Sequence, residues 1–210
     1  MSIDEEELKI KILTLGNSSV GKTSFIQRYT HNTFQIDAIS TIGNEMQRKI
    51  IEINNKSYKV DFHDTQGQER YKAIAVNFIK NADGIILMYD ITKQTTFDSV
   101  SEWMENIRKA KSNEFPVVLI GNKCDLEGER VITKEEGEEL ANKYGLSFYE
   151  TSNKDGTNIE ASCLDLVNKA IIDKQEELKK NPGRKSSIKL DKKKVVTKKS
   201  GKSKCTCKEK

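Results

Sequence analysis

The sequence lacks any long apolar run. Its longest uninterrupted apolar stretch is Ile85–Tyr89, whereas a helix that crosses a bilayer needs about 20 apolar residues, so no transmembrane helix is expected. The first seven residues are acidic where a secretory signal would be basic and then apolar, and Ser2 stands where N-myristoylation requires glycine. With 35% apolar and 32% charged residues in 210, we expect one soluble domain of ordinary size.

Cysteine and histidine are also scarce. Four cysteines in a chain without an expected export signal favour reduced thiols over a disulfide framework. The two histidines, His31 and His63, show no zinc-ligand spacing with the cysteines. Cys163 and Trp103 lie on apolar stripes of helical segments, and we expect both side chains to be buried in the core.

Positive charge is concentrated at the end of the chain. Residues 181–210 contain 12 Lys and Arg but only two acids, whereas the first 180 residues contain 24 basic and 30 acidic ones. The body is therefore mildly acidic and the tail strongly basic. Helical periodicity stops near residue 178, so the sequence predicts a folded domain over 1–178 and a disordered basic tail over 179–210.

Short apolar runs alternate with segments of helical spacing. Strands are predicted over residues 8–15, 46–53, 56–62, 85–89, 117–120 and 147–150, and helices over 23–29, 97–110, 133–144 and 159–178. The turn-forming pair Asn54-Asn55 indicates a hairpin between the second and third strands. This alternation predicts an α/β fold with a mostly parallel, six-stranded sheet that is covered by helices on both faces.

Residues 16–23 match the phosphate-binding motif G-x-x-x-x-G-K-[ST] between the first strand and the first helix. Its glycines allow backbone N–H groups to surround phosphates at a helix N-terminus. Lys22 would reach the β- and γ-phosphates, and the Thr23 hydroxyl would bind Mg²⁺. A flexible turn without a ligand is the less favoured alternative. The motif indicates a purine nucleotide without saying which.

Residues 122–125, Asn-Lys-Cys-Asp, follow a buried strand, where ligand loops gather in parallel sheets. The Asp125 carboxylate can accept hydrogen bonds from N1–H and the 2-amino group of guanine. Adenine offers neither donor, so the carboxylate would be left unpaired against it. The pattern therefore favours guanine, although such residues are also common in turns.

Residues 64–69, Asp-Thr-Gln-Gly-Gln-Glu, follow the third strand. Asp64 is suited to hold Mg²⁺ through water, Gly67 allows a backbone N–H to approach the γ-phosphate, and Gln68 would orient the attacking water. Taken in isolation, a polar turn with a glycine is the simpler interpretation.

In this order the three motifs resemble the small GTPases of the Ras superfamily over nearly the whole body. The resemblance implies the P-loop small GTPase fold, GTP and GDP with Mg²⁺, and hydrolysis of GTP with Gln68 as the catalytic residue. It implies nucleotide contacts from Ser18, Ser19, Val20, Gly21, Lys22, Thr23, Ser24, Phe34, Thr41, Gly67, Asn122, Lys123, Asp125, Ser152, Asn153 and Lys154. Thr23, Thr41 and Asp64 match the Mg²⁺ positions.

Within this superfamily the sequence is most similar to Rab proteins, as in residues 69–71, 87–92 and 121–126. Residues 16–25 also resemble the secretory-vesicle subgroup. The resemblance implies a switch that regulates vesicle traffic. Its partners would be a guanine nucleotide exchange factor, a GTPase-activating protein, a GDP dissociation inhibitor, the Rab escort protein and effectors.

Several positions depart from the family pattern. Gln66 and Asn153 replace the alanines of D-T-A-G-Q and T-S-A-K. For Asn153 we expect little loss of guanine binding, because the family uses only the backbone N–H of this position toward guanine. Met46 and His63 replace two of three aromatic residues that effectors recognise, with Phe78 in the third place. Gln66 and the altered aromatics keep an alternative open, a GTP-clamped membrane scaffold that hydrolyses poorly.

The tail carries Cys205 and Cys207 after its lysines, which resembles the cysteine pair of Rab proteins. We expect both to be geranylgeranylated, because stable anchoring takes two lipid signals. Each basic residue adds about 1 kcal/mol near an anionic leaflet. This predicts a cytoplasmic protein held at the cytosolic face of vesicle or organelle membranes. The lysines have no interleaved aromatic residues, so nucleic acid is not an expected ligand. The trailing residues 208–210 depart from the common C-x-C ending.

Overall fold

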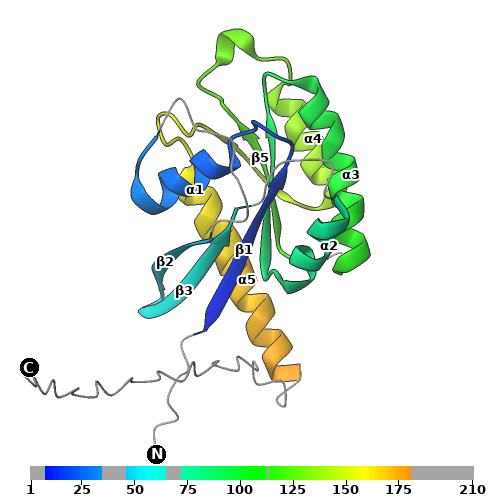
Figure 1. Cartoon of the computed structure of the whole chain (residues 1–210). Coiled ribbons are helices and arrows are strands. Elements are labelled where there is room, and N and C mark those ends of the chain that lie inside the picture. Colours follow the sequence, from blue (N-terminus) through cyan, green and yellow to red (C-terminus); the bar gives the residue numbers. More distant parts are fainter. Residues whose placement is uncertain (1–7, 35–45, 65–71, 113, 181–210) are drawn as a thin grey trace, which may run out of the picture.

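The computed structural model describes residues 8–34, 46–64, 72–112 and 114–180 (Figure 1). One sheet has the strand order β2-β3-β1-β4-β5-β6. Its strands are β1 (Lys9–Gly16), β2 (Met46–Ile53), β3 (Lys56–His63), β4 (Gly84–Asp90), β5 (Val117–Asn122) and β6 (Ser147–Thr151). The helices are α1 (Lys22–His31), α2 (Lys72–Asn81), α3 (Gln94–Ala110), α4 (Lys134–Tyr144) and α5 (Ile159–Lys180), with a short 3₁₀ helix, η2 (Glu127–Glu129).

The sheet confirms the predicted α/β fold. Strand β2 pairs antiparallel with β3, and the other four strand pairs are parallel. The hairpin turn at Asn54 and Asn55 has φ of 52° and 60°, the left-handed conformation that a two-residue hairpin turn requires and that asparagine tolerates. The central strand β4 is buried along its whole length, as its continuous apolar sequence predicts.

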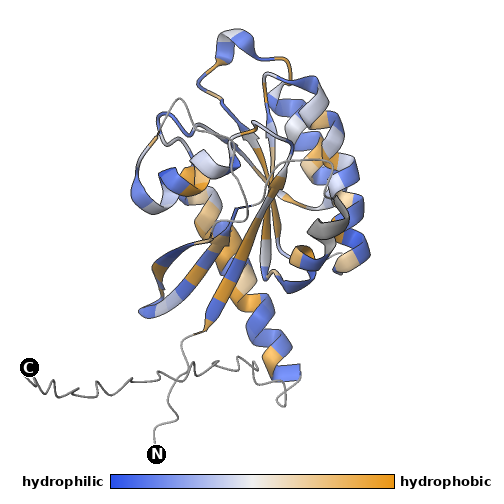
Figure 2. Cartoon of the chain, in the orientation of Figure 1, coloured by the Kyte–Doolittle hydropathy of each residue, from blue (hydrophilic) through white to orange (hydrophobic). Residues whose placement is uncertain are grey.

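Helices cover both faces of the sheet (Figure 1). On one face α1 and α5 enclose a core that contains Phe25 and Cys163. On the other face α2, α3 and α4 enclose a second core that contains Trp103. Figure 2 shows the apolar residues gathered between these layers and polar residues on the outer helix surfaces. The predicted burial of Cys163 and Trp103 is confirmed, at 0% and 5% exposure.

One helix was not predicted, and the ends of the other four differ from the prediction by at most three residues. Helix α2 was not predicted, because its apolar residues, 73–76 and 78–79, run almost consecutively rather than at helical spacing; its Ile79 is fully buried against the sheet. Helix α5 continues to Lys180 rather than ending at residue 178. Lysines in its last turn complement the helix dipole, and Nζ of Lys180 lies 3.8 Å from Oε2 of Glu176.

The parallel strands place their carboxyl ends at one edge of the sheet. Strands β1, β3, β4, β5 and β6 all run in the same direction, so the loops that follow them meet at that edge, where open α/β sheets bind ligands. Among the described helices, none is both long and apolar enough to cross a membrane.

Candidate functional site

The loop between β1 and α1 curves around the ammonium group of Lys22. Nζ of Lys22 donates hydrogen bonds to the carbonyls of Gly16, at 3.0 Å, and Asn17, at 2.7 Å, and the residue is only 5% exposed. Gly16 has φ of 135°, and a Cβ atom there would lie 2.2 Å from the Met88 carbonyl oxygen of β4. The loop therefore requires glycine at this point and holds a buried cation at its centre.

The first turn of α1 and the end of β3 bring two oxygen groups together. Oγ1 of Thr23 donates to Oδ2 of Asp64 at 2.5 Å, and Oγ1 of Thr14 lies 3.4 Å from the other carboxylate oxygen. Asp64 is 3% exposed. Hydroxyl and carboxylate oxygens are the ligand types that Mg²⁺ prefers, so this donor set fits the ion. Thr41, Gly67 and Gln68, which the sequence assigns to the same region, lie outside the described residues.

The two predicted base loops are joined to each other and to the phosphate loop. Nδ2 of Asn122 donates to the Val20 carbonyl at 2.7 Å, and its Oδ1 accepts from Oγ1 of Thr151 at 3.0 Å. The Asp125 carboxylate is exposed and accepts from Oγ of Ser152 at 2.8 Å. A carboxylate is thus held at the rim of the site, with its hydroxyl partner buried beside it.

The remaining predicted residues lie around these groups. Ser18, Ser19 and Lys154 are exposed, and Phe34, at the end of a described segment, is 37% exposed. Asn153 is buried, and its Nδ2 donates to the Gly21 carbonyl at 2.9 Å. The side chain of Asn153 therefore makes a specific contact that the sequence did not predict.

Asp90 is a further charged residue at this edge that sequence reasoning missed. Its fully buried carboxylate lies 2.6 Å from Nζ of Lys123, and its Oδ1 accepts from the backbone N–H and the hydroxyl of Thr92. The available signal was its place at the carboxyl end of a buried parallel strand. This ion pair fixes Lys123, which stands between Asn122 and Asp125 in the base motif.

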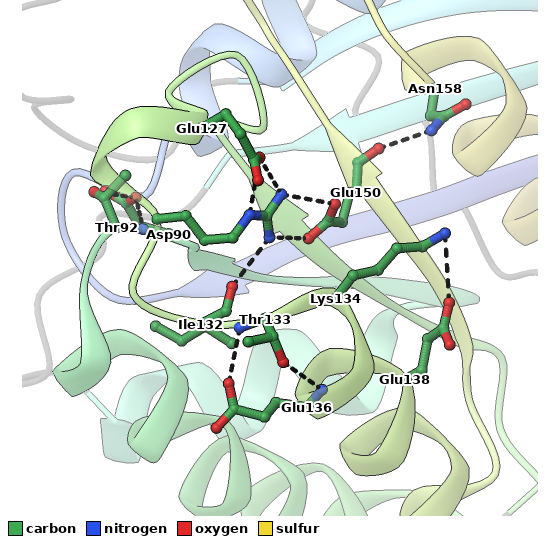
Figure 3. Close-up of polar contacts among 11 residues, drawn as sticks. Asp90, Thr92, Glu127, Ile132, Thr133, Lys134, Glu136, Glu138, Glu150 and Asn158 are labelled. Carbon is green, nitrogen blue, oxygen red and sulfur yellow. Dashed lines mark hydrogen bonds and ion pairs between the residues drawn. The ribbon is translucent and has the colours of Figure 1, made fainter.

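Arg130 connects the loop after Asp125 to β6. Its guanidinium donates two parallel hydrogen bonds to the Glu150 carboxylate, at 2.5 and 3.0 Å, and a third to Glu127 at 2.9 Å. Figure 3 shows the Glu127 and Glu150 carboxylates with the dashed lines of these hydrogen bonds. Hydrogen bonds to Glu150 and then to Glu127 raise the pKa of Arg130 above its ordinary value. Since Glu150 directly precedes the second base loop, the bidentate pair holds the two base loops together.

The start of α4 is fixed in the same region. Thr133 and Glu136 form a capping box, in which each side chain accepts a hydrogen bond from the other residue's backbone N–H (Figure 3). Cys124, inside the base motif, donates its backbone N–H to the Thr151 carbonyl at 3.1 Å. Burial and then the carboxylates of Asp155 and Glu150 raise the pKa of its thiol to about 11, so the thiol is protonated at neutral pH.

Comparison with known proteins agrees with this geometry. A model of the Ras family matches residues 11–172. The chain is 43% identical to Ras-related protein Rab-3 of Caenorhabditis elegans over 173 residues. This aligned region covers 82% of this chain and 78% of that protein. It is 43% identical over 167 residues to Ras-related protein Rab-3A of Homo sapiens, covering 80% and 76%.

A plant relative matches nearly as well. Identity to Ras-related protein Rab11A of Lotus japonicus is 41% over 152 residues, which covers 72% of this chain and 67% of that protein. These matches favour a hydrolysing switch over the GTP-clamped scaffold. The chain therefore belongs to the Ras family of small GTPases, and within it to the Rab proteins, which hydrolyse GTP and act as switches in vesicle trafficking.

Proposed function

We propose that this chain binds GTP and GDP with Mg²⁺ at the carboxyl edge of its sheet and switches between the two bound states. The observation that carries the proposal is the convergence at this edge of a buried lysine, a hydroxyl–carboxylate pair and an exposed carboxylate. Lys22, Thr23 with Asp64, and Asp125 have the chemistry for phosphates, a divalent cation and guanine respectively.

The phosphates would lie in the loop over residues 16–23. Backbone N–H groups from Ser18 to Ser24 would donate to phosphate oxygens at the N-terminus of α1, where the helix dipole also favours negative charge. Lys22 would contribute its positive charge toward the β- and γ-phosphates. Thr23 and Asp64 would hold Mg²⁺ together with Thr41, and the bound ion would neutralise charge on these two phosphates.

The guanine base would lie between the loops at residues 122–125 and 151–154. Asp125 would accept from N1–H and the 2-amino group, and its bond from Ser152 keeps the carboxylate in place. The backbone N–H of Asn153 would donate to O6 of guanine. Lys123, Lys154 and Phe34 would contact the faces of the bound nucleoside. Buried Asn122 joins this pocket to the phosphate loop.

Hydrolysis would proceed by attack of water on the γ-phosphorus, which breaks the bond to the β–γ bridging oxygen and releases phosphate. Gln68 would orient that water. Before hydrolysis, Thr41 and the backbone N–H of Gly67 would hold their loops against the γ-phosphate, and loss of phosphate would release them.

Single-turnover hydrolysis of preloaded GTP tests this assignment. We expect measurable turnover in the wild type, at least about tenfold slower turnover in Gln68→Leu because the water loses its orienting group, and retained turnover in Gln66→Ala. The assignment would be wrong if Gln68→Leu hydrolysed GTP at the wild-type rate. If the wild type showed no turnover and Gln66→Ala restored it, the result would instead support the GTP-clamped scaffold.

The basic residues beyond α5 would place this switch on a membrane. We propose that Cys205 and Cys207 carry geranylgeranyl groups, which the Rab escort protein presents for transfer and the GDP dissociation inhibitor later covers. The excess of ten positive charges over residues 181–210 supports contact with an anionic cytosolic leaflet. A guanine nucleotide exchange factor, a GTPase-activating protein and effectors would complete the cycle.

A further inference from the structure

Two neighbouring carbonyl groups of the phosphate loop each accept an asparagine amide, one from each base loop. The Val20 carbonyl accepts from Nδ2 of Asn122 at 2.7 Å, and the Gly21 carbonyl accepts from Nδ2 of Asn153 at 2.9 Å. Asn122 belongs to the N-K-x-D motif. Asn153 stands where the T-S-A-K pattern has alanine, which has no side-chain amide. The second hydrogen bond therefore follows from this chain's own sequence.

Both amides are packed closely against the loop. Asn153 is 5% exposed, and a Cβ atom built on Gly21 would lie 2.7 Å from its Nδ2 and 2.5 Å from Nδ2 of Asn122. Gly21 has φ of 99°, which also favours glycine. The same Gly21 carbonyl accepts the first backbone hydrogen bond of α1, from the Phe25 N–H at 2.8 Å. The Asn153 bond therefore fixes the start of the helix that carries Lys22.

Arg28 makes a second contact, to the backbone of the second base loop. Nε of Arg28, on α1, donates to the Asn153 carbonyl at 2.9 Å, and its Nη2 donates to the Lys154 carbonyl. The backbone at residues 153–154 is thus bound to α1 while the Asn153 side chain reaches the N-terminal end of that helix. The second base loop is therefore bound to the phosphate loop at Gly21 and to helix α1 at Arg28.

We propose that Asn153 is a positioning residue that couples the base loop to the phosphate loop and slows the release of bound nucleotide. The inference rests on the proposed guanine-nucleotide site. When the two loops are linked, base and phosphate contacts must open together, whereas an unlinked base loop can open alone and let the nucleotide leave in steps. The side chain therefore contributes to retention of the nucleotide without touching it.

The test is the dissociation rate of fluorescent GDP from the full chain in Mg²⁺. Asn153→Ala removes one amide–carbonyl hydrogen bond, and we expect release about three- to tenfold faster than in the wild type. Asn153→Asp keeps the side-chain volume but presents a carboxylate that cannot donate to the Gly21 carbonyl. At neutral pH it should therefore release GDP at least as fast as Asn153→Ala. As the pH falls and the introduced carboxyl gains a proton, it can donate again, and its rate relative to wild type should fall.

Asn81→Ala is the matched control. It loses a bond of the same kind, from Nδ2 of Asn81 to the Asn77 carbonyl at 2.9 Å, at the end of α2, and should release GDP at the wild-type rate. Coupling is overturned if Asn153→Ala releases GDP as slowly as the wild type, or if Asn153→Asp at neutral pH retains it as well as the wild type. If the wild type binds no GDP at all, the proposed function itself fails, which is a different result.

Discussion

Replacing Asp125 with asparagine is expected to weaken GDP and GTP binding by at least about a hundredfold. The carboxylate offers acceptors to both N1–H and the 2-amino group of guanine, and hydrogen bonds to a charged group contribute about 1.5–3 kcal/mol each. An asparagine amide keeps one acceptor and turns an NH₂ group toward the second donor. Loss of one charged bond and weakening of the other amount to about 3 kcal/mol.

The same variant should improve binding of xanthosine nucleotides, because xanthine has an oxygen where guanine has its 2-amino group and the new NH₂ group can donate to it. Titration with fluorescent GDP, and competition by xanthosine diphosphate, measure both effects. Asp155→Asn is the control, since that exposed carboxylate accepts from Thr157 within its own loop, and its GDP affinity should match the wild type. Unchanged GDP affinity in Asp125→Asn would remove Asp125 from the base site.

Removing the charge of Lys22 is expected to lower GTP affinity by more than about a hundredfold. The ammonium lies at the centre of the phosphate loop, is 5% exposed and bonds the carbonyls of Gly16 and Asn17. Its loss removes both the cation that would meet the phosphates and the group that draws the loop closed. Two functions of one side chain are lost together, which is why we expect an effect this large.

Lys22→Met separates charge from volume, because methionine is long and apolar but carries no donor. Titration of Lys22→Met and Lys22→Ala with fluorescent GTP at a fixed Mg²⁺ concentration should show the loss in both. Lys134→Ala, which removes an exposed lysine on α4, should bind as the wild type does. GTP binding by Lys22→Met within tenfold of the wild type would mean that the ammonium contributes little to phosphate binding.

Local sequence patterns predicted most of the fold. Buried strands such as β4 are continuous apolar runs, the hairpin turn is marked by Asn54-Asn55, and the order of strands and helices indicates a parallel sheet. Helix α2 was missed because its apolar residues run almost consecutively rather than at helical spacing. The phosphate loop and the base loop at 122–125 were recognised because their chemistry is contained in a few consecutive residues.

The contacts that join these loops could not be predicted in the same way. Asn153 and Gly21 are 132 residues apart, and the indole N–H of Trp103 donates to Oδ1 of Asn17 across 86 residues. From local patterns we expect Trp103 in the core and little loss of nucleotide binding from Asn153, because neither pattern reveals a partner far along the chain. Arg130 and Glu150 likewise lie 20 residues apart, and only the fold brings the Arg130 guanidinium to the Glu150 carboxylate.

Identification of the nucleotide that the purified full chain carries tests the central claim most directly. The bound molecule is released by denaturation, separated by ion-exchange chromatography and compared with guanine and adenine standards. Because Asp125 pairs with donors that guanine has and adenine lacks, we expect GDP or GTP at close to one per chain. An adenine nucleotide, or a chain that carries no nucleotide and takes up no GDP after chelation of Mg²⁺, would contradict the account.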